Sequence, residues 1–311
     1  MAKILITESV HPIGPELLTA AGHTVVYADR DMDIIRREIV DADAVLVRII
    51  ELPGSLLATA KNLKIVSKHG VGYDNIDLDY CKSHGVAVTI TPNANSLSVA
   101  EHAFTLMLTL AKNIIPVSNK YRMVGFAAKN HAPGLEMTGK TLGLIGMGRI
   151  GKHVLHMCKD GLDMHVIVYD PYISEVPEGV EKVDDLSELL RRADVVTLHC
   201  LLTDETRKLI DRERLALMKP TALLINCARG PIVDEAALIE ALENGRLAGA
   251  GLDVTDPEPV APDSPLFKLP NVIVTPHYAP TTVESATRVS KIAAENINAV
   301  LAGQESVGRI V

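Results

Sequence analysis

The stretch Thr141-Leu-Gly-Leu-Ile-Gly-Met-Gly-Arg-Ile-Gly151 decides the fold, because a short apolar run leads directly into three closely spaced glycines. The run predicts a buried strand over 143–145, and the residues after it predict a helix over 149–159. A glycine-rich turn between strand and helix is the pattern that binds a dinucleotide pyrophosphate. Gly146 permits the tight turn, Gly148 lets backbone N–H groups approach the phosphates, and Gly151 lets the helix pack on the strand.

The next segment, Met164-His-Val-Ile-Val-Tyr-Asp170, predicts a second strand that ends in an acid. Asp170 lies 24 residues after Gly146, where its carboxylate can accept hydrogen bonds from both adenosine ribose hydroxyls. The same charge would repel a 2′-phosphate, so the spacing favours NAD over NADP. The alternative is a glycine-rich turn without a ligand, and the strand, helix and acid in this order argue against it.

The composition is that of a soluble globular protein with room for two domains, since 47% of the 311 residues are hydrophobic and 23% are charged. No segment approaches 18 uninterrupted apolar residues, and the first residues, Met-Ala-Lys-Ile-Leu-Ile-Thr, predict a strand rather than a signal peptide. We therefore expect a cytoplasmic protein that does not bind membranes.

The net charge, the cysteines and the histidines limit which partners, disulfide bonds and metal sites we expect. The net charge is −8, with no Trp and only three Phe, which argues against a nucleic acid partner. Cysteines at 81, 158, 200 and 227 include no Cys-x-x-Cys pair, so we expect reduced thiols. His153 and His156 lie three residues apart, but without a third ligand they predict no metal site.

Short apolar strands alternate with helix-like stretches, which predicts an α/β fold. Strands are expected at 3–7, 24–27, 44–48, 64–68 and 86–91, and, after the glycine motif, at 195–198, 222–226, 249–254 and 272–275. Long helices are expected at 99–112 and 284–301. The first turn, 8–14, lacks phosphate-binding glycines, so we assign the opening unit to substrate. We predict two Rossmann-like, doubly wound parallel-sheet domains: a flavodoxin-like substrate domain (1–97 plus 281–311) and an NAD-binding Rossmann domain (98–280).

Three chemically active side chains follow three different strands of the second half: Arg229, Glu258 and His277. Since the carboxyl ends of parallel strands face the ligand crevice, we expect them to lie near the cofactor. A guanidinium can hold a substrate carboxylate through two parallel hydrogen bonds and polarise a neighbouring carbonyl. Arg229 therefore has the chemistry to bind an acid; an arginine paired with a surface acid is the alternative.

His277 has the chemistry of an acid or base, because a ketone reduced by hydride transfer needs a proton at its oxygen and imidazole titrates near neutral pH. Glu258 is its expected partner, since a carboxylate favours the imidazolium and fixes which ring nitrogen points at substrate. On spacing alone, a solvated Pro-Glu-Pro turn and a buried structural histidine remain open.

Taken together, Gly146–Gly151, Asp170, the segment Asn226–Glu235, the segment Asp253–Glu258 and Pro276-His277 resemble the D-2-hydroxyacid dehydrogenase family in order and spacing. The resemblance implies that Arg229 binds the substrate carboxylate, Glu258 supports His277, His277 is the acid/base, and Asp253 helps to hold the nicotinamide carboxamide. The cofactor-binding residues that we expect are Gly146, Gly148, Arg149, Ile150, Gly151, Asp170, Cys200, Thr206, Cys227, Ala228 and Asp253, with NAD as the cofactor.

The runs 68–77 and 91–101 are most similar to the D-3-phosphoglycerate dehydrogenase branch of this family. In that branch, the loop at Val71 and Gly72 offers N–H groups to the substrate carboxylate, and basic residues matching Arg48 and Lys68 face the phosphate. The chain departs from the branch at Arg48-Ile49, where Arg-Ser is usual, and at the Tyr and Pro after His277. Lys68 stands where arginine is usual, which weakens a bidentate phosphate clamp. Because the sequence ends at 311, we expect no regulatory extension of the kind that the longer enzymes of this branch carry.

The resemblance implies a small 2-hydroxy acid interconverted with its 2-keto acid, with 3-phosphoglycerate/phosphohydroxypyruvate and hydroxypyruvate/glyoxylate as the candidate pairs. It also implies a homodimer built on the long helix after Val99. Formate or phosphite oxidation is a rival, but the formate branch carries glutamine where this chain has Glu258. An NAD(H)-sensing, corepressor-like protein is the alternative from another class, since such proteins keep Arg229, Glu258 and His277. His69, His102 and His199 are most simply explained as structural.

Overall fold

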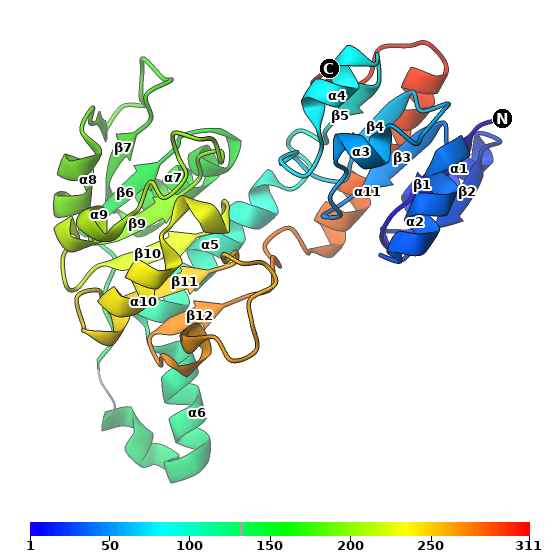
Figure 1. The fold of residues 1–311 in the computed structure, drawn as a ribbon. Coiled ribbons are helices and arrows are strands. Elements are labelled where there is room, and N and C mark those ends of the chain that lie inside the picture. The colour runs from blue at the N-terminus through cyan, green and yellow to red at the C-terminus, as the bar shows by residue number, and fades with distance from the viewer. Residues whose placement is uncertain (131–132) are drawn as a thin grey trace. The chain divides into compact units, whose positions relative to one another are not determined.

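The computed structural model describes residues 1–130 and 133–311. The chain forms two compact units, one made of Met1–Asn95 with Pro280–Val311 (unit 1) and one made of Ser96–Ala279 (unit 2). Each unit is built on a parallel β-sheet with helices on both faces (Figure 1). Among the described residues, no helix combines the length and the apolar character needed to cross a membrane.

Unit 1 contains a five-stranded sheet in the order β2-β1-β3-β4-β5. Its strands are β1 (Lys3–Ile6), β2 (Thr24–Tyr27), β3 (Ala44–Val47), β4 (Ile65–Lys68) and β5 (Ala87–Thr89). Its helices are α1 (Ile13–Ala20), α2 (Met32–Glu38), α3 (Gly54–Leu57), α4 (Leu78–Ser83) and α11 (Val283–Leu301), with the 3-10 turn η1 (Ile39–Asp41). Ile4 and Ile6 pack toward α1 and α11, whereas Leu5 packs toward α2 and α4, as the two-residue period of a strand requires.

Unit 2 contains a seven-stranded sheet in the order β12-β11-β10-β9-β6-β7-β8. Its strands are β6 (Thr141–Ile145), β7 (His165–Tyr169), β8 (Val180–Lys182), β9 (Val195–Leu198), β10 (Leu223–Asn226), β11 (Gly249–Leu252) and β12 (Val272–Val274). Helices α5 (Ser96–Ala111) and α7 (Arg149–Leu162) cover one face, and α8 (Leu186–Arg192), α9 (Arg212–Leu217) and α10 (Glu235–Glu243) cover the other. The remaining elements are α6 (Ile114–Val124), η2 (Gly125–Asn130), η3 (Gly230–Ile232) and η4 (Pro265–Lys268).

The order of the unit 2 strands reverses between β6 and β9. From β6 the chain adds strands in one direction through β7 and β8, and it then returns to add β9 on the other side of β6. In open α/β sheets, ligands bind outside the carboxyl ends of the strands at such a switch point. The glycine-rich turn leaves β6 at this point, so the topology places it where a ligand is expected.

The predicted fold class, two doubly wound α/β domains, is confirmed. Two details of the predicted elements differ. The sequence did not indicate β8, because this edge strand is only three residues long and reads Val-Glu-Lys without an apolar run. The helix expected from residue 99 begins at Ser96, because the polar residues Ser96 and Ser98 are buried in its first turn.

Candidate active site

The three glycines of the turn after β6 have three different surroundings. Gly146 has φ +89°, and a Cβ there would lie 2.8 Å from the backbone N of Cys200. A Cβ on Gly151 would lie 2.3 Å from the carbonyl oxygen of Gly146, so only glycine lets α7 start this close to the strand. A Cβ on Gly148 would meet nothing within 4 Å. The turn therefore leaves open space at Gly148, where the backbone can approach a bound phosphate.

Helix α7 begins directly after Gly148 and has no side-chain cap at its N-terminus. The first N–H groups of a helix lack intrahelical partners, and an uncapped N-terminus attracts anions. Arg149 is exposed in the first turn, whereas Ile150 is half-buried and packs on the cluster between α5, α7 and the sheet. The open backbone at Gly148 and the uncapped helix fit the pyrophosphate of a dinucleotide.

Asp170 follows β7 and lies beside the glycine-rich turn. Its Oδ2 accepts the Met147 N–H at 2.9 Å, and its Oδ1 accepts the Tyr172 N–H at 3.0 Å. Since each carboxylate oxygen can accept two hydrogen bonds, these contacts orient the side chain and leave capacity for a ribose hydroxyl. The residue is half-buried, which keeps its charge close to the turn.

Four of the residues predicted to bind the cofactor follow β9 or β10, namely Cys200, Thr206, Cys227 and Ala228. Their side chains are small or already hydrogen-bonded within the protein. Cys200 is half-buried and Cys227 is buried, and burial raises the pKa of Cys200 to about 11 and that of Cys227 well above its usual range. Both are therefore neutral thiols at neutral pH. Thr206 donates its hydroxyl to the Leu201 carbonyl at 2.6 Å, which closes the loop after β9. Ala228 is half-buried and packs against the hydrophobic cluster on the opposite face of the sheet, which α8, α9 and α10 cover.

Arg229 lies in a tight turn after β10 that Asn226 shapes. The Asn226 side chain accepts the Ala228 N–H at 3.0 Å and donates to the Arg229 carbonyl at 2.9 Å. The next residue, Gly230, lies against the loop after β11, since a Cβ there would be 1.9 Å from the Thr255 carbonyl oxygen. The half-buried Arg229 donates from Nη1 to the Ala228 carbonyl at 2.7 Å. The sequence did not indicate the roles of Asn226 and Gly230, because both depend on contacts across strands.

His277 and Glu258 meet, although they follow different strands. His277 Nδ1 lies 2.6 Å from Glu258 Oε1, and the two side chains are 31% and 37% exposed. This partial exposure leaves the pair accessible to a small molecule. His277 has φ +53°, which is uncommon for a residue with a side chain. Its backbone N–H donates to the Asp253 carbonyl at 2.8 Å, which helps to hold this conformation.

Asp253 is buried at the end of β11, and its carboxylate binds the segment around His277. It accepts the Thr275 hydroxyl at 2.6 Å and the N–H groups of Tyr278 and Ala279 at 2.7 and 2.9 Å. His102 Nε2, on α5, lies 2.9 Å from Thr275 Oγ1. These contacts give Asp253 an anchoring role that the sequence did not indicate.

Four of the five predicted substrate-binding residues lie in unit 1, and the fifth, Arg229, lies in unit 2. Arg48 follows β3 and donates from Nη1 to the Ser9 carbonyl at 2.9 Å. Lys68, at the end of β4, is buried, and its ammonium binds the Arg48 carbonyl and, at 2.6 Å, Asn75 Oδ1. Val71 and Gly72 are half-buried in the loop after β4. The structure therefore gives both cations protein partners, which the sequence did not predict.

The buried carboxylate of Glu8 accepts backbone N–H groups at the end of β3, namely those of Arg48 at 2.7 Å and Ile49 at 2.9 Å. Its hydrogen bonds fix the backbone from which the Arg48 side chain extends.

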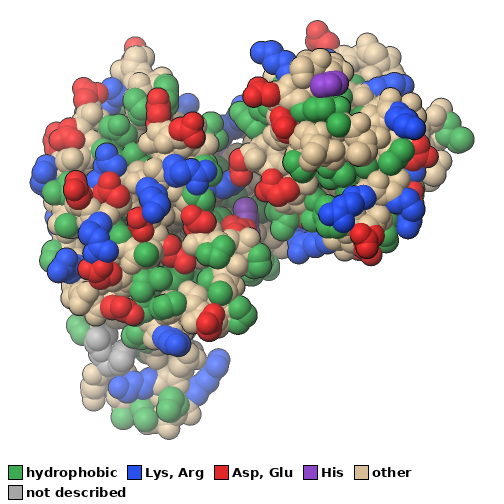
Figure 2. Space-filling model, viewed as in Figure 1, with side chains coloured by type: hydrophobic (Ala, Val, Ile, Leu, Met, Phe, Trp, Pro, Cys, Tyr) green, Lys and Arg blue, Asp and Glu red, His purple; other side chains and the backbone are tan. Residues whose placement is uncertain are grey.

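On the face of the molecule drawn in Figure 2, positive and negative side chains are interspersed.

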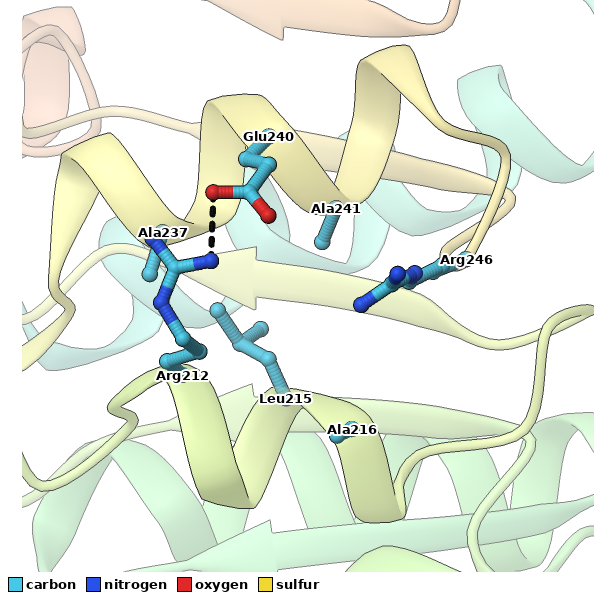
Figure 3. A pocket seen from close by; sticks show the side chains of 7 residues that line it. All are labelled: Arg212, Leu215, Ala216, Ala237, Glu240, Ala241 and Arg246. Carbon is cyan, nitrogen blue, oxygen red and sulfur yellow. Dashed lines mark hydrogen bonds and ion pairs between the residues drawn. The ribbon is translucent and has the colours of Figure 1, made fainter.

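A shallow hollow lies between α9 and α10, and none of the predicted site residues lines it (Figure 3). Its floor is formed by Leu215 and three alanines, and Arg212 forms an ion pair with Glu240 at one end. Arg246 extends toward the other end. This hollow contains none of the groups that the sequence associates with catalysis.

Residues 104–279 match the family described as D-isomer specific 2-hydroxyacid dehydrogenase, NAD binding domain. The chain belongs to this family. The matched residues include the glycine-rich turn, Arg229, Glu258 and His277, whereas the predicted substrate-binding residues of unit 1 lie outside the match. The family resemblance drawn from the sequence is confirmed.

Similar proteins extend the match to nearly the whole chain. A D-3-phosphoglycerate dehydrogenase of Methanocaldococcus jannaschii is 42% identical over 98% of this chain and 58% of its own length. The chain thus spans little more than half of that relative. A glyoxylate reductase of Thermofilum pendens is 37% identical over 97% of this chain and 92% of its own. A D-lactate dehydrogenase of Aquifex aeolicus, solved with NAD and lactic acid, is 33% identical, with 96% of each chain covered and a TM-score of 0.87.

Proposed function

We propose that this protein is an NAD-dependent oxidoreductase that interconverts a small D-2-hydroxy acid and its 2-keto acid. The observation that carries the proposal is the His277–Glu258 pair at 2.6 Å, held by a loop in the same unit as the dinucleotide-type turn. An imidazole paired with a carboxylate is a proton donor and acceptor, which the reduction of a ketone requires. The curated relatives named for 2-hydroxy acid and 2-keto acid reactions support the same reaction class.

In the proposed reaction, Arg229 binds the substrate carboxylate and orients the neighbouring carbonyl. Glu258 occupies Nδ1 of His277, so Nε2 is the ring nitrogen that remains for the substrate. That nitrogen gives a proton to the carbonyl oxygen during reduction and takes it back during oxidation. Bound NAD supplies or accepts the hydride at the substrate carbon. Glu258 stabilises the imidazolium while the proton is held.

We assign unit 2 to the cofactor. Gly146, Gly148, Gly151 and the N-terminus of α7 would hold the pyrophosphate, and Asp170 the adenosine ribose. Because a carboxylate repels a 2′-phosphate, we propose NAD rather than NADP as the preferred cofactor. Cys200, Thr206, Cys227 and Ala228 would line the same site, with Asp253 near the nicotinamide.

We assign unit 1 to substrate recognition through Arg48, Lys68, Val71 and Gly72. Since the Lys68 ammonium binds the Arg48 carbonyl and Asn75, it would act on a bound anion through its charge rather than as a clamp. The candidate pairs remain 3-phosphoglycerate/phosphohydroxypyruvate and hydroxypyruvate/glyoxylate.

We further propose that the protein is a homodimer. The helix expected to form the interface, the one after Val99, is α5 and packs on the sheet of unit 2, so we place the interface on α6 and η2, which follow it. Helix α6 has no buried residue and extends away from the sheet of unit 2 (Figure 1). Its large apolar side chains are exposed, as are those that follow it, with Met123 at 83% and Phe126 at 73%. A second copy of the same surface would bury them. Sedimentation should show a dimer for the wild type and a monomer for the Met123→Glu/Phe126→Glu variant; a wild-type monomer would refute the proposal.

Unpaired thiols at Cys81, Cys158, Cys200 and Cys227 fit a reducing compartment, and we propose the cytoplasm as the location. Two of these thiols, Cys81 and Cys158, are buried in separate units, where burial raises their pKa to about 11 and about 12. They are therefore hydrophobic packing residues rather than reactive groups.

The experiment that tests the proposed function follows the loss of NADH absorbance with a panel of 2-keto acids, and repeats the fastest reaction with NADPH. Turnover of phosphohydroxypyruvate above the others would assign the phosphorylated pair. A preference for glyoxylate or hydroxypyruvate would keep the mechanism and assign the smaller substrate. Binding of NADH without turnover of any keto acid would contradict the proposal and favour an NAD(H)-sensing protein.

A further inference from the structure

We propose that His102 is a positioning residue for the reaction, which holds the loop that carries His277 by donating a hydrogen bond to Thr275. The inference rests on the proposed function. His102 lies on α5, whereas Thr275 and His277 follow β12, so the contact joins segments more than 170 residues apart. Its side chain is 17% exposed, which places the ring at the edge of the packed interior.

The hydrogen-bond directions in this cluster follow from the number of protons present. The Thr275 hydroxyl has one proton, and it donates to Asp253 Oδ1 at 2.6 Å. Thr275 Oγ1 must therefore accept from His102 Nε2, 2.9 Å away. The same N–H lies 3.4 Å from Asp253 Oδ1. His102 is thus a donor at Nε2, both when it is neutral and when it is protonated.

His102 contacts the chain on both sides of His277. Its hydrogen bond reaches Thr275, two residues before His277, and its ring meets the Tyr278 ring edge-on, with the centroids 6.3 Å apart and the planes at 61°. Asp253, which the same N–H approaches, binds the amides of Tyr278 and Ala279. The imidazole of His102 therefore braces a short segment in which His277 is central.

This segment needs bracing because His277 has a strained backbone, with φ +53°. Residues in such conformations keep them only when the surrounding structure holds them, and they are common at functional sites. A small shift of the loop would rotate the His277 ring away from Glu258 or from the substrate. His102 lies on α5, which packs against the sheet and is therefore held in place. Its contacts with Thr275 and Tyr278 restrict the movement of the loop that carries His277.

The experiment compares His102→Leu, which removes the donor, with His102→Gln, whose amide N–H can reach the same oxygen. We expect His102→Leu to lower kcat about tenfold, with the Kd for NADH unchanged within about twofold. His102→Gln should keep most of the activity. Hydrogen exchange gives a readout independent of turnover: the amides of residues 277–279 should exchange about tenfold faster in His102→Leu and not in His102→Gln.

Two further variants keep the test decisive. Thr275→Val replaces the hydroxyl by a methyl group, which removes the acceptor for His102 together with the hydrogen bond to Asp253, and it should lower kcat at least about tenfold. His156→Leu, at an exposed histidine of α7, is the matched control and should leave kcat and exchange unchanged. Wild-type kcat in both His102→Leu and Thr275→Val, or equal losses in His102→Leu and His102→Gln, would overturn the inference. An inactive wild type would instead contradict the proposed function and leave the exchange measurement as the test of the His102 contact.

Discussion

His277 Nδ1 lies 2.6 Å from Glu258 Oε1, although the two residues follow different strands and are 19 positions apart. The contact forms because β11 and β12 are parallel neighbours, so the loops that leave their carboxyl ends start side by side. A carboxylate at this distance fixes the orientation of the ring. The pair gives the proposed proton transfer its geometry.

Glu258→Gln tests the charge of this pair while keeping its shape. We expect kcat to fall about tenfold to hundredfold, because the glutamine still orients the ring but no longer stabilises the imidazolium. The Kd for NADH, measured by fluorescence titration, should not change. Glu243→Gln, at an exposed position of α10, serves as the control. Wild-type kcat in Glu258→Gln would show that the ion pair has no part in the reaction.

Asp170→Asn tests the proposed preference for NAD. Asparagine has nearly the same shape but a single acceptor oxygen, so the variant removes the charge and keeps only one of the two hydrogen bonds from the Met147 and Tyr172 N–H groups. We expect NADH binding to weaken by about tenfold, equivalent to about 1.4 kcal/mol, and NADPH binding to improve. Isothermal titration with both cofactors measures the change. An unchanged ratio of the two affinities would refute the argument from ribose recognition.

Gly230→Ala tests the contact between the Arg229 turn and the loop that leads to Glu258. The new methyl group would lie 1.9 Å from the Thr255 carbonyl oxygen, so one of the two loops must move. We expect a loss of about 3 kcal/mol in the free energy of unfolding, measured by urea denaturation, and a clear loss of kcat.

Gly161→Ala is the matched control, since a methyl group there meets nothing within 4 Å and the residue lies in α7. Alanine is the better helix former, so this variant should gain up to about 1 kcal/mol. Equal stabilities for the two variants would show that the Gly230 contact is unimportant.

The sequence predicted the strand ends well and the contacts between them poorly. Buried parallel strands are continuous apolar runs, so Arg229 and His277 were recognisable as polar residues that follow such runs. The contact of His102 with Thr275 has no sequence signal, because it depends on how α5 packs against the sheet. The sequence did not predict the partners of Lys68 for the same reason, because Asn75 and the Arg48 carbonyl approach it only in the folded unit.

The stability of the protein should depend on pH through two half-buried histidines, one in each unit. Burial lowers the pKa of both His69 and His199 to about 3, and each ring has a buried nitrogen without a hydrogen bond among the described residues. An unfolded histidine takes up a proton near pH 6.5, whereas these two stay neutral in the folded protein. Acid therefore favours the unfolded chain, and the stability present above pH 6.5 is lost as the pH falls toward 3.

Between pH 7 and pH 5, each of these histidines should reduce the free energy of unfolding by about 2 kcal/mol. Urea denaturation at both pH values measures the loss. Replacing His199 with Gln should reduce the dependence by about half, whereas His165→Gln, at an exposed histidine of β7, should not. A free energy of unfolding that is the same at pH 5 and pH 7 would contradict this explanation.

The most direct test of the central claim follows the hydride itself, with NADH deuterated at C4 of the nicotinamide and hydroxypyruvate as the acceptor. We predict that NMR will show deuterium at C2 of the product and that chiral chromatography will identify D-glycerate. His277→Gln should slow the transfer by at least about a hundredfold while binding NADH normally. A product without deuterium at C2, or a His277→Gln variant that transfers deuterium at the wild-type rate, would contradict the account.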